Sequence, residues 1–171
     1  MSPLLATAFG VGILGGIATW LYLTVGTILI WAAFVAWASF FAIGGDTRAI
    51  GLNLTSNAFG VFVAWLVALI VLANPLGLPG PLWVGLLVLV SVVLYISASA
   101  FPSFSSVPAV TLGYATTFAY ISQTPDAFTF DALLSPSFRN VLIVVIVSMS
   151  IGTGFATASA RLSAALTRKS A

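Results

Sequence analysis

Cysteine, histidine and glutamate are missing from this sequence of 171 residues, and charge of either sign is scarce. Without cysteine the chain has no disulfides, no thiolate chemistry and no iron–sulfur ligation. Charged residues make up 5% of the chain, against roughly 25% in an ordinary soluble domain. Five basic residues and three acidic residues provide too little polar surface for a soluble fold of this length. The net charge is only +2 and the basic residues are scattered along the chain, which also argues against nucleic acid as a partner.

Apolar residues make up 61% of the chain, and long stretches carry no charge (residues 1–45, 49–125 and 140–160). A membrane-spanning helix needs about 20 mostly apolar residues, so these stretches have room for about six spans. The strands of a membrane barrel alternate apolar and polar residues, which this chain does not do. We therefore expect an all-α integral membrane protein, a single transmembrane domain over residues 1–171. Its spans are expected near Pro3–Leu23, Thr27–Gly44, Ala49–Ala73, Pro81–Ala100, Phe104–Ser122 and Phe138–Ala160.

Turn-forming residues separate these spans. Residues 74–81 are rich in proline and glycine and break any helix between the third and fourth spans. Asp46 is placed to cap the third span, an interpretation that we prefer to a catalytic role. Residues 95–108, with two prolines and five serines, form either a plain turn or a broken helix that lines a cavity. Residues 123–135 are expected to form a short interfacial helix or loop.

Basic residues predict the orientation. With six spans, both termini share one side of the membrane with the loops after spans two and four. The positive-inside rule places that side in the cytoplasm, including a tail at residues 161–171. A five-span chain would separate Arg48 from the basic tail unless the lost span lay before it. The cytoplasmic side would carry Arg48, Arg161, Arg168 and Lys169, and the opposite side only Arg139.

A weak internal echo relates the second and fifth spans. Residues 37–42 (WASFFA) resemble residues 114–119 (YATTFA). Both lie near the C-terminal end of the middle span of a three-span half, the halves being residues 1–73 and 81–160. Two halves of three spans enter the membrane in opposite directions, so the echo predicts an inverted repeat, which is common in transport proteins. Chance similarity between apolar spans is the alternative.

Ionisable side chains are missing from the interior of every predicted span. This argues against a proton-coupled transporter that uses side-chain carriers, and against an intramembrane protease or a metal enzyme. Serines and threonines are plentiful, but no base accompanies them. Asp46, Asp126 and Asp131 belong near the membrane surfaces and have no metal-binding spacing. We therefore expect no enzyme activity, no catalytic residue, no metal site and no cofactor.

The densest neutral polar cluster lies in the third span. Asn53 and Asn57 are four residues apart and share one helix face, with Ser56 beside them and Gly60 on the same stripe. An amide facing lipid would cost several kcal/mol, so the pair is expected to face protein or a polar cavity. Interhelical hydrogen bonding, worth roughly 0.6 kcal/mol per contact, and solute binding are equally good interpretations of the pair.

The fifth span offers hydroxyl partners to this stripe. We expect the asparagines to lie near the membrane midplane, close to residues 108–117. The candidates for lining a pore or binding a solute are therefore Asn53, Ser56, Asn57, Pro108, Tyr114, Thr116 and Thr117. Small residues at packing spacing predict close helix contacts, and these are Gly12, Gly16, Gly60, Gly152 and Ala156.

Two stretches carry a resemblance to a known family. Residues 106–113 (SVPAVTLG), running on through residues 117–119, look like a motif of a family of uncharacterised bacterial inner-membrane proteins. Residues 31–45, with Asn57 and Gly60 beyond them, are similar to the corresponding part of that family, and the similarity covers most of the chain. Thr111 departs from the pattern, which often has Phe there. The resemblance implies a compact multi-span fold in a bacterial inner (plasma) membrane and brings no substrate.

These features predict a passive channel or simple permease for a small polar solute such as urea, a short amide or a small anion. Pore width and hydrogen-bond partners would set its selectivity. Its expected partners are the lipid bilayer, the solute and further copies of the chain in a homo-oligomer. The alternative is a non-transporting membrane subunit that scaffolds or regulates a partner complex.

Overall fold

The computed structural model describes residues 1–168, which form α-helices joined by short connections. Each of the six predicted spans coincides with one helix, and Lys169 of the predicted tail lies outside the described residues. A one-turn helix η1 (Pro102–Phe104) and a short helix α6 (Phe130–Leu133) occupy two of the connections. The main helices are α1 (Pro3–Val25), α2 (Ile30–Ala42), α3 (Thr47–Ala73), α4 (Gly80–Ala98), α5 (Val107–Gln123) and α7 (Val141–Arg168).

Four of the described helices, α1, α3, α4 and α7, are long and apolar enough to cross a membrane. Helix α2 has 13 residues and is therefore about 20 Å long, shorter than a hydrocarbon core of about 30 Å. Helix α5 has 17 residues. Helix α2 ends early because Gly44 and Gly45 follow it with φ angles of 116° and 65°, which the α-helix does not accommodate. The count of six spans stays a prediction.

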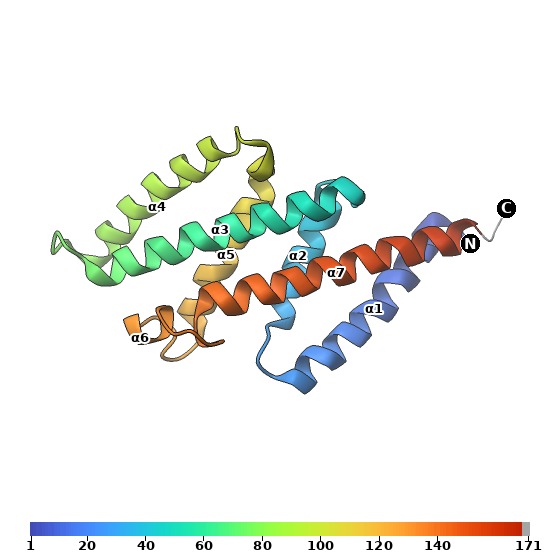
Figure 1. Cartoon of the computed structure of the whole chain (residues 1–171), viewed down its shortest axis with the longest axis horizontal. Helices are drawn as coiled ribbons and strands as arrows, with labels where there is room; N and C mark the ends of the chain where they lie inside the picture. The colour runs from blue at the N-terminus through green and yellow to red at the C-terminus, as the bar shows by residue number, and fades with distance from the viewer. Residues whose placement is uncertain (169–171) are drawn as a thin grey trace.

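The helices form a bundle with α3 and α7 antiparallel at its centre (Figure 1). Helices α2 and α5 cross behind them, α5 packing mainly on α3 and α2 mainly on α7. Helix α1 flanks α7 and helix α4 flanks α3, on opposite sides of the central pair. The interior is therefore built from α2, α3, α5 and α7.

Local sequence accounts for where the helices begin. The side chain of Asp46 accepts a hydrogen bond from the Ala49 backbone N–H at 2.8 Å, which confirms the predicted cap of α3. Ser2 caps α1 in the same way, before Pro3 in its first turn. Helix α7 begins at Val141, and it continues through residues 161–168 because no glycine or proline stops it there.

Three glycines let the central helices touch backbone to backbone. Gly60 of α3 lies against the carbonyl group of Val110 on α5, and Gly113 of α5 lies against the main chain of Asn57. A Cβ atom at either glycine would collide with those backbone atoms. Small residues at crossings are how membrane helices approach closely.

The same kind of contact joins α7 to α2, where Gly152 lies against the main chain of Ala33. Ala156 is fully buried in a cluster with Trp37 and Phe40. The close contacts predicted for Gly60, Gly152 and Ala156 are thus present in the bundle.

The predicted contacts of Gly12 and Gly16 are not formed with any of residues 1–168. Both glycines face outward from α1, and a Cβ atom at either would meet nothing within 4 Å. Gly10 packs against Ser159 and Ser163 of α7 instead, because α1 turns a different face inward. Helix α1 is apolar on all sides, so polarity does not mark its buried face. Contact of the outward pair with a second copy of the chain stays a prediction.

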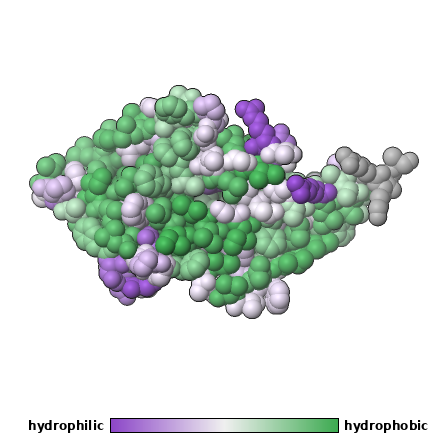
Figure 2. Space-filling view, in the orientation of Figure 1, coloured by the Kyte–Doolittle hydropathy of each residue, from purple (hydrophilic) through white to green (hydrophobic). Residues whose placement is uncertain are grey.

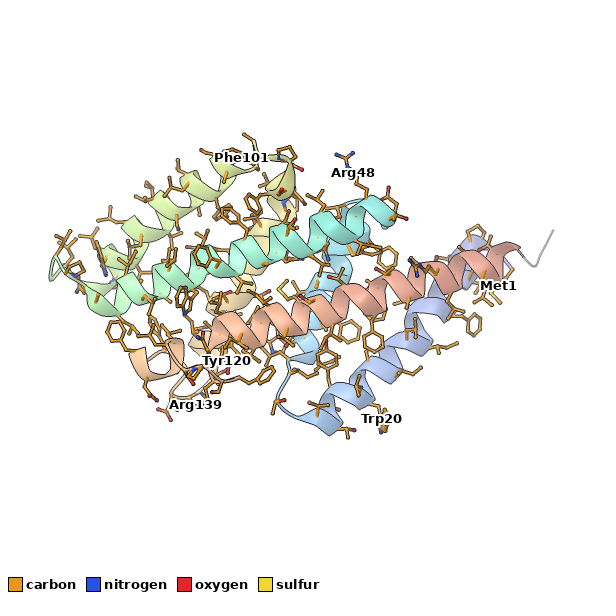
Figure 3. All side chains as sticks on the ribbon, viewed as in Figure 1. Met1, Trp20, Arg48, Phe101, Tyr120 and Arg139 are labelled. Atoms are coloured by element: carbon orange, nitrogen blue, oxygen red, sulfur yellow. The ribbon has the colours of Figure 1, made fainter. Side chains whose placement is uncertain are left out.

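The outer surface is largely hydrophobic (Figure 2). Large apolar side chains stand exposed along α1 and α4, among them Leu4, Trp20, Leu89 and Leu94. Hydrophilic residues gather in a few patches at the margins, and Figure 3 places Arg48 and Arg139 on opposite margins. Arg139 pairs with Asp131 of α6 at 2.9 Å, and both side chains are exposed. Such a surface suits solvation by lipid around the middle of the bundle.

Candidate functional site

Asn53 of α3 connects three helices from the centre of the bundle. Its side chain is fully buried. The amide Nδ2 donates one hydrogen bond to the main-chain carbonyl of Ala36 on α2 at 3.0 Å and another to Thr153 Oγ1 on α7 at 2.8 Å. A carbonyl oxygen can only accept, so Nδ2 and not Oδ1 must face Ala36. The orientation of the Asn53 amide is therefore set by the backbone of α2.

Asn57 lies one turn further along α3 and takes its orientation from Asn53. Its Nδ2 donates to Asn53 Oδ1 at 2.9 Å. Because an amide oxygen can only accept, the Asn57 atom that faces Asn53 Oδ1 must be the nitrogen. The other end of the amide, Asn57 Oδ1, is buried and has no hydrogen-bond partner among residues 1–168. The Asn57 side chain is 2% exposed. The bundle thus holds an unpaired acceptor in its interior.

A small cavity of about 10 Å³ adjoins Asn57 between α3 and α7. A cavity of this size has room for no more than about one water molecule. Thr153 Oγ1 accepts from Asn53 and donates to the Met149 carbonyl at 3.0 Å, so its proton is already in use. The cavity is lined by Leu54, Asn57, Ala58 and Val61 of α3 and by Ile146, Met149, Ser150 and Thr153 of α7.

The expected partners on α5 do not bond to the asparagines. The hydroxyl of Tyr114 lies 2.9 Å from Ser91 Oγ on α4, and Thr117 Oγ1 donates to the Gly113 carbonyl of its own helix at 2.9 Å. Helix α5 does lie next to Asn57, but it meets α3 through backbone at Gly113. The amide side chains consequently point to α2 and α7, and the prediction of Tyr114 and Thr117 as their partners is wrong.

The remaining candidates are scattered. Thr116 is buried in α5, whereas Pro108 is exposed in the first turn of that helix, where proline fits without losing a hydrogen bond. Ser56 is fully buried, and its hydroxyl has no partner among residues 1–168. The structure therefore joins Asn53 and Asn57 of the predicted set by a hydrogen bond, whereas Pro108 is exposed.

Thr153 was missed as a member of the site. A signal for it exists in the sequence, because α7 carries hydroxyl residues at 148, 150, 153, 157 and 159 within an otherwise apolar span. Their spacing does not decide which of them meets α3. Ser148, for example, faces elsewhere and accepts a hydrogen bond from the Leu29 backbone N–H at 2.9 Å.

An open cleft lies at the end of the bundle where α3 begins, and its lining on α7 begins at Thr157, one helical turn beyond Thr153. It has a volume of about 450 Å³ and is lined in part by Asp46, Thr157 and Arg161. Thr157 Oγ1 donates to the Thr153 carbonyl at 2.8 Å, so the cleft and the cavity meet the same stretch of α7. A second cleft of about 320 Å³ at the α3 N-terminus includes Arg48.

Comparison with known proteins adds a family to this geometry. The family described as "Protein of unknown function (DUF1097)" matches residues 8–164. The chain belongs to the DUF1097 family. No curated protein matches the chain, and no solved structure does. Membership confirms the resemblance to an uncharacterised family and adds no substrate.

In this DUF1097 member, replacing Asn53→Leu is expected to lower the free energy of unfolding by about 2 to 4 kcal/mol. The change removes the bonds to Ala36 and Thr153 and leaves Asn57 Nδ2 without its acceptor. Thermal unfolding of the purified protein in detergent measures the effect. Ser56→Ala is the matched control on the same helix, because its hydroxyl has no partner to lose. Equal effects for the two variants would contradict the role of Asn53.

Proposed function

We propose that this DUF1097 chain is a passive channel or simple permease for a small polar solute, of the urea, short-amide or small-anion class. The observation that supports the proposal is the unpaired Asn57 Oδ1 beside a cavity between the two central helices. Leaving a buried acceptor unpaired costs about 1 to 3 kcal/mol, so such a group calls for a bound partner. A solute or water in the cavity would supply one.

We propose that solute reaches this position from the cleft at the end of the bundle where α3 begins. The cleft that contains Thr157 is separated from the cavity at Thr153 by one turn of α7. The cavity holds about one water molecule, so a larger solute passes only when α3 and α7 move apart. The polar groups that line the cavity are neutral and no charged residue among residues 1–168 lines it, which favours passive passage over ion-coupled transport.

We also propose that the halves α1–α2–α3 and α4–α5–α7 are inverted repeats. The contact of Gly60 with Val110 corresponds to that of Gly152 with Ala33. The spacing along the chain from Ala33 to Val110 equals that from residue 37 to residue 114, where the sequence echo begins. The antiparallel central pair and the opposite positions of α1 and α4 in Figure 1 support the same relation. Inverted-repeat transporters bind solutes where their halves meet, as α3 and α7 do here.

For the topology, we predict that Arg48 and Lys169 lie in the cytoplasm and Asp131 lies outside. Four of the five basic residues would then be cytoplasmic, as the positive-inside rule requires. In Figure 3, Arg48 lies at the upper edge and Met1 toward the right-hand end, both away from Arg139 at the lower left. Single cysteines introduced at the three positions can be labelled from either side, because the chain has no cysteine of its own. Arg48 and Lys169 on opposite sides would remove both the six-span topology and the inverted repeat.

Solute flux into liposomes that contain the purified protein tests the proposed function. A screen over neutral and anionic small molecules is expected to find at least one solute that enters faster than into protein-free liposomes of the same lipid. If every solute enters at the protein-free rate, the channel proposal fails and the scaffolding alternative takes its place.

A further inference from the structure

We infer that the cavity beside Asn57 is a site for an uncharged hydrogen-bond donor, and that it selects against anions. Water would fill it at rest, and an N–H group of a neutral solute such as urea would replace the water during passage. The inference rests on the proposed function and narrows its solute class. It depends on the direction of the hydrogen bonds around Asn53 and Asn57, which is fixed by the backbone.

The direction of these bonds starts at the carbonyl of Ala36. This carbonyl accepts from Asn53 Nδ2, so Asn53 Oδ1 must face Asn57. Asn53 Oδ1 accepts from Asn57 Nδ2, so Asn57 Oδ1 remains free to accept. Turning over either amide would place two acceptors against each other, beginning with Asn53 Oδ1 against the Ala36 carbonyl. The backbone of α2 thereby makes the free group an acceptor.

The other polar groups of the cavity also favour a ligand that donates hydrogen bonds. Thr153 has its proton committed to the Met149 carbonyl and keeps one lone pair after accepting from Asn53. Ser150 has a hydroxyl that can donate or accept. A water molecule, through its two O–H bonds, can therefore donate to Asn57 Oδ1 and Thr153 Oγ1 together. An amino group can do the same through two N–H bonds. Two to four polar partners are what a buried water needs.

Charge and size exclude the other candidates. An anion at this position would face two acceptors, and the lining of the cavity includes no arginine or lysine among residues 1–168. A cation such as ammonium would find acceptors but no carboxylate, because the lining includes no aspartate either. Burying an unpaired ion is far more costly than burying a neutral donor. The cavity of about 10 Å³ admits one amino group or one water at a time.

Paired solutes of equal shape test the selectivity in the liposome assay at neutral pH. Urea and nitrate are both planar and trigonal, and formamide and formate differ mainly in an amino group against an oxygen anion. We expect urea and formamide to enter at least about tenfold faster than nitrate and formate, after subtraction of protein-free rates. Faster entry of nitrate or formate would overturn the inference and leave the proposed function standing.

A high-resolution crystal structure, from crystals grown in the presence of bromide, provides a readout that does not depend on transport. We expect a solvent peak about 3 Å from Asn57 Oδ1 and no anomalous bromide signal in the cavity. Bromide at that position, or a cavity without any solvent peak, would overturn the donor site. If no solute crosses the liposomes, the proposed function fails, and this structure still decides whether the site binds a donor.

Discussion

Replacing Gly60→Ala is expected to destabilise the protein by about 3 kcal/mol or more. A Cβ atom at this position would collide with the carbonyl of Val110 and lie 2.9 Å from the Tyr114 backbone nitrogen. These are main-chain atoms of α5, so no side-chain rotation can relieve the overlap, and α3 and α5 would have to separate. Unfolding of the purified variant in detergent, followed by heat or denaturant, measures the loss.

Gly51→Ala is the matched control for this prediction. It makes the same change on the same helix, at an exposed position where a Cβ atom meets nothing within 4 Å. Alanine favours a helix over glycine by about 1 kcal/mol, so the control is expected to be neutral or slightly stabilising. Gly152→Ala should resemble Gly60→Ala, because it collides with the backbone of Ala33. Equal stability of the Gly60 and Gly51 variants would refute the backbone contact between α3 and α5.

Replacing Asn57→Leu is expected to abolish solute flux while changing the melting temperature little. Leucine has nearly the shape of asparagine, but it removes the unpaired acceptor Oδ1 of a residue that lines the cavity. Asn53 Oδ1 loses its donor, but the change also removes the unpaired Oδ1 of Asn57, which offsets part of that cost. The stability loss stays small because Asn53 keeps its bonds to Ala36 and Thr153, which hold α2 and α7 against α3. The liposome flux assay and thermal unfolding are measured on the same preparation.

Asn53→Leu is the comparison that separates binding from helix packing. If the asparagines only join helices, Asn57→Leu should lower stability and leave flux per folded protein unchanged. If Asn57 binds the solute, Asn53→Leu should mainly lower stability, whereas Asn57→Leu should mainly lower flux. Unaltered flux in a well-folded double variant, Asn53→Leu with Asn57→Leu, would remove this site from the channel proposal.

The sequence alone determined the class of protein and the places of its main helices. Apolar length and charge are properties of consecutive residues, so six helical segments could be located before any contact was known. Asp46 was identified as a cap for the same reason, because its bond reaches only to Ala49. The cost of exposing two amides to lipid was enough to place Asn53 and Asn57 in the interior.

Only the tertiary structure decided how the helices are rotated and which groups they bring together. Helix α1 is apolar on every side, and lipid and protein solvate such a surface about equally well. Its sequence therefore did not show that Gly10 would face inward and Gly12 outward. The choice of Thr153 over Thr117 as partner of Asn53 depends on α5 meeting α3 through backbone at Gly113. Such a contact is decided by how closely two helices can approach, which depends on the atoms of both.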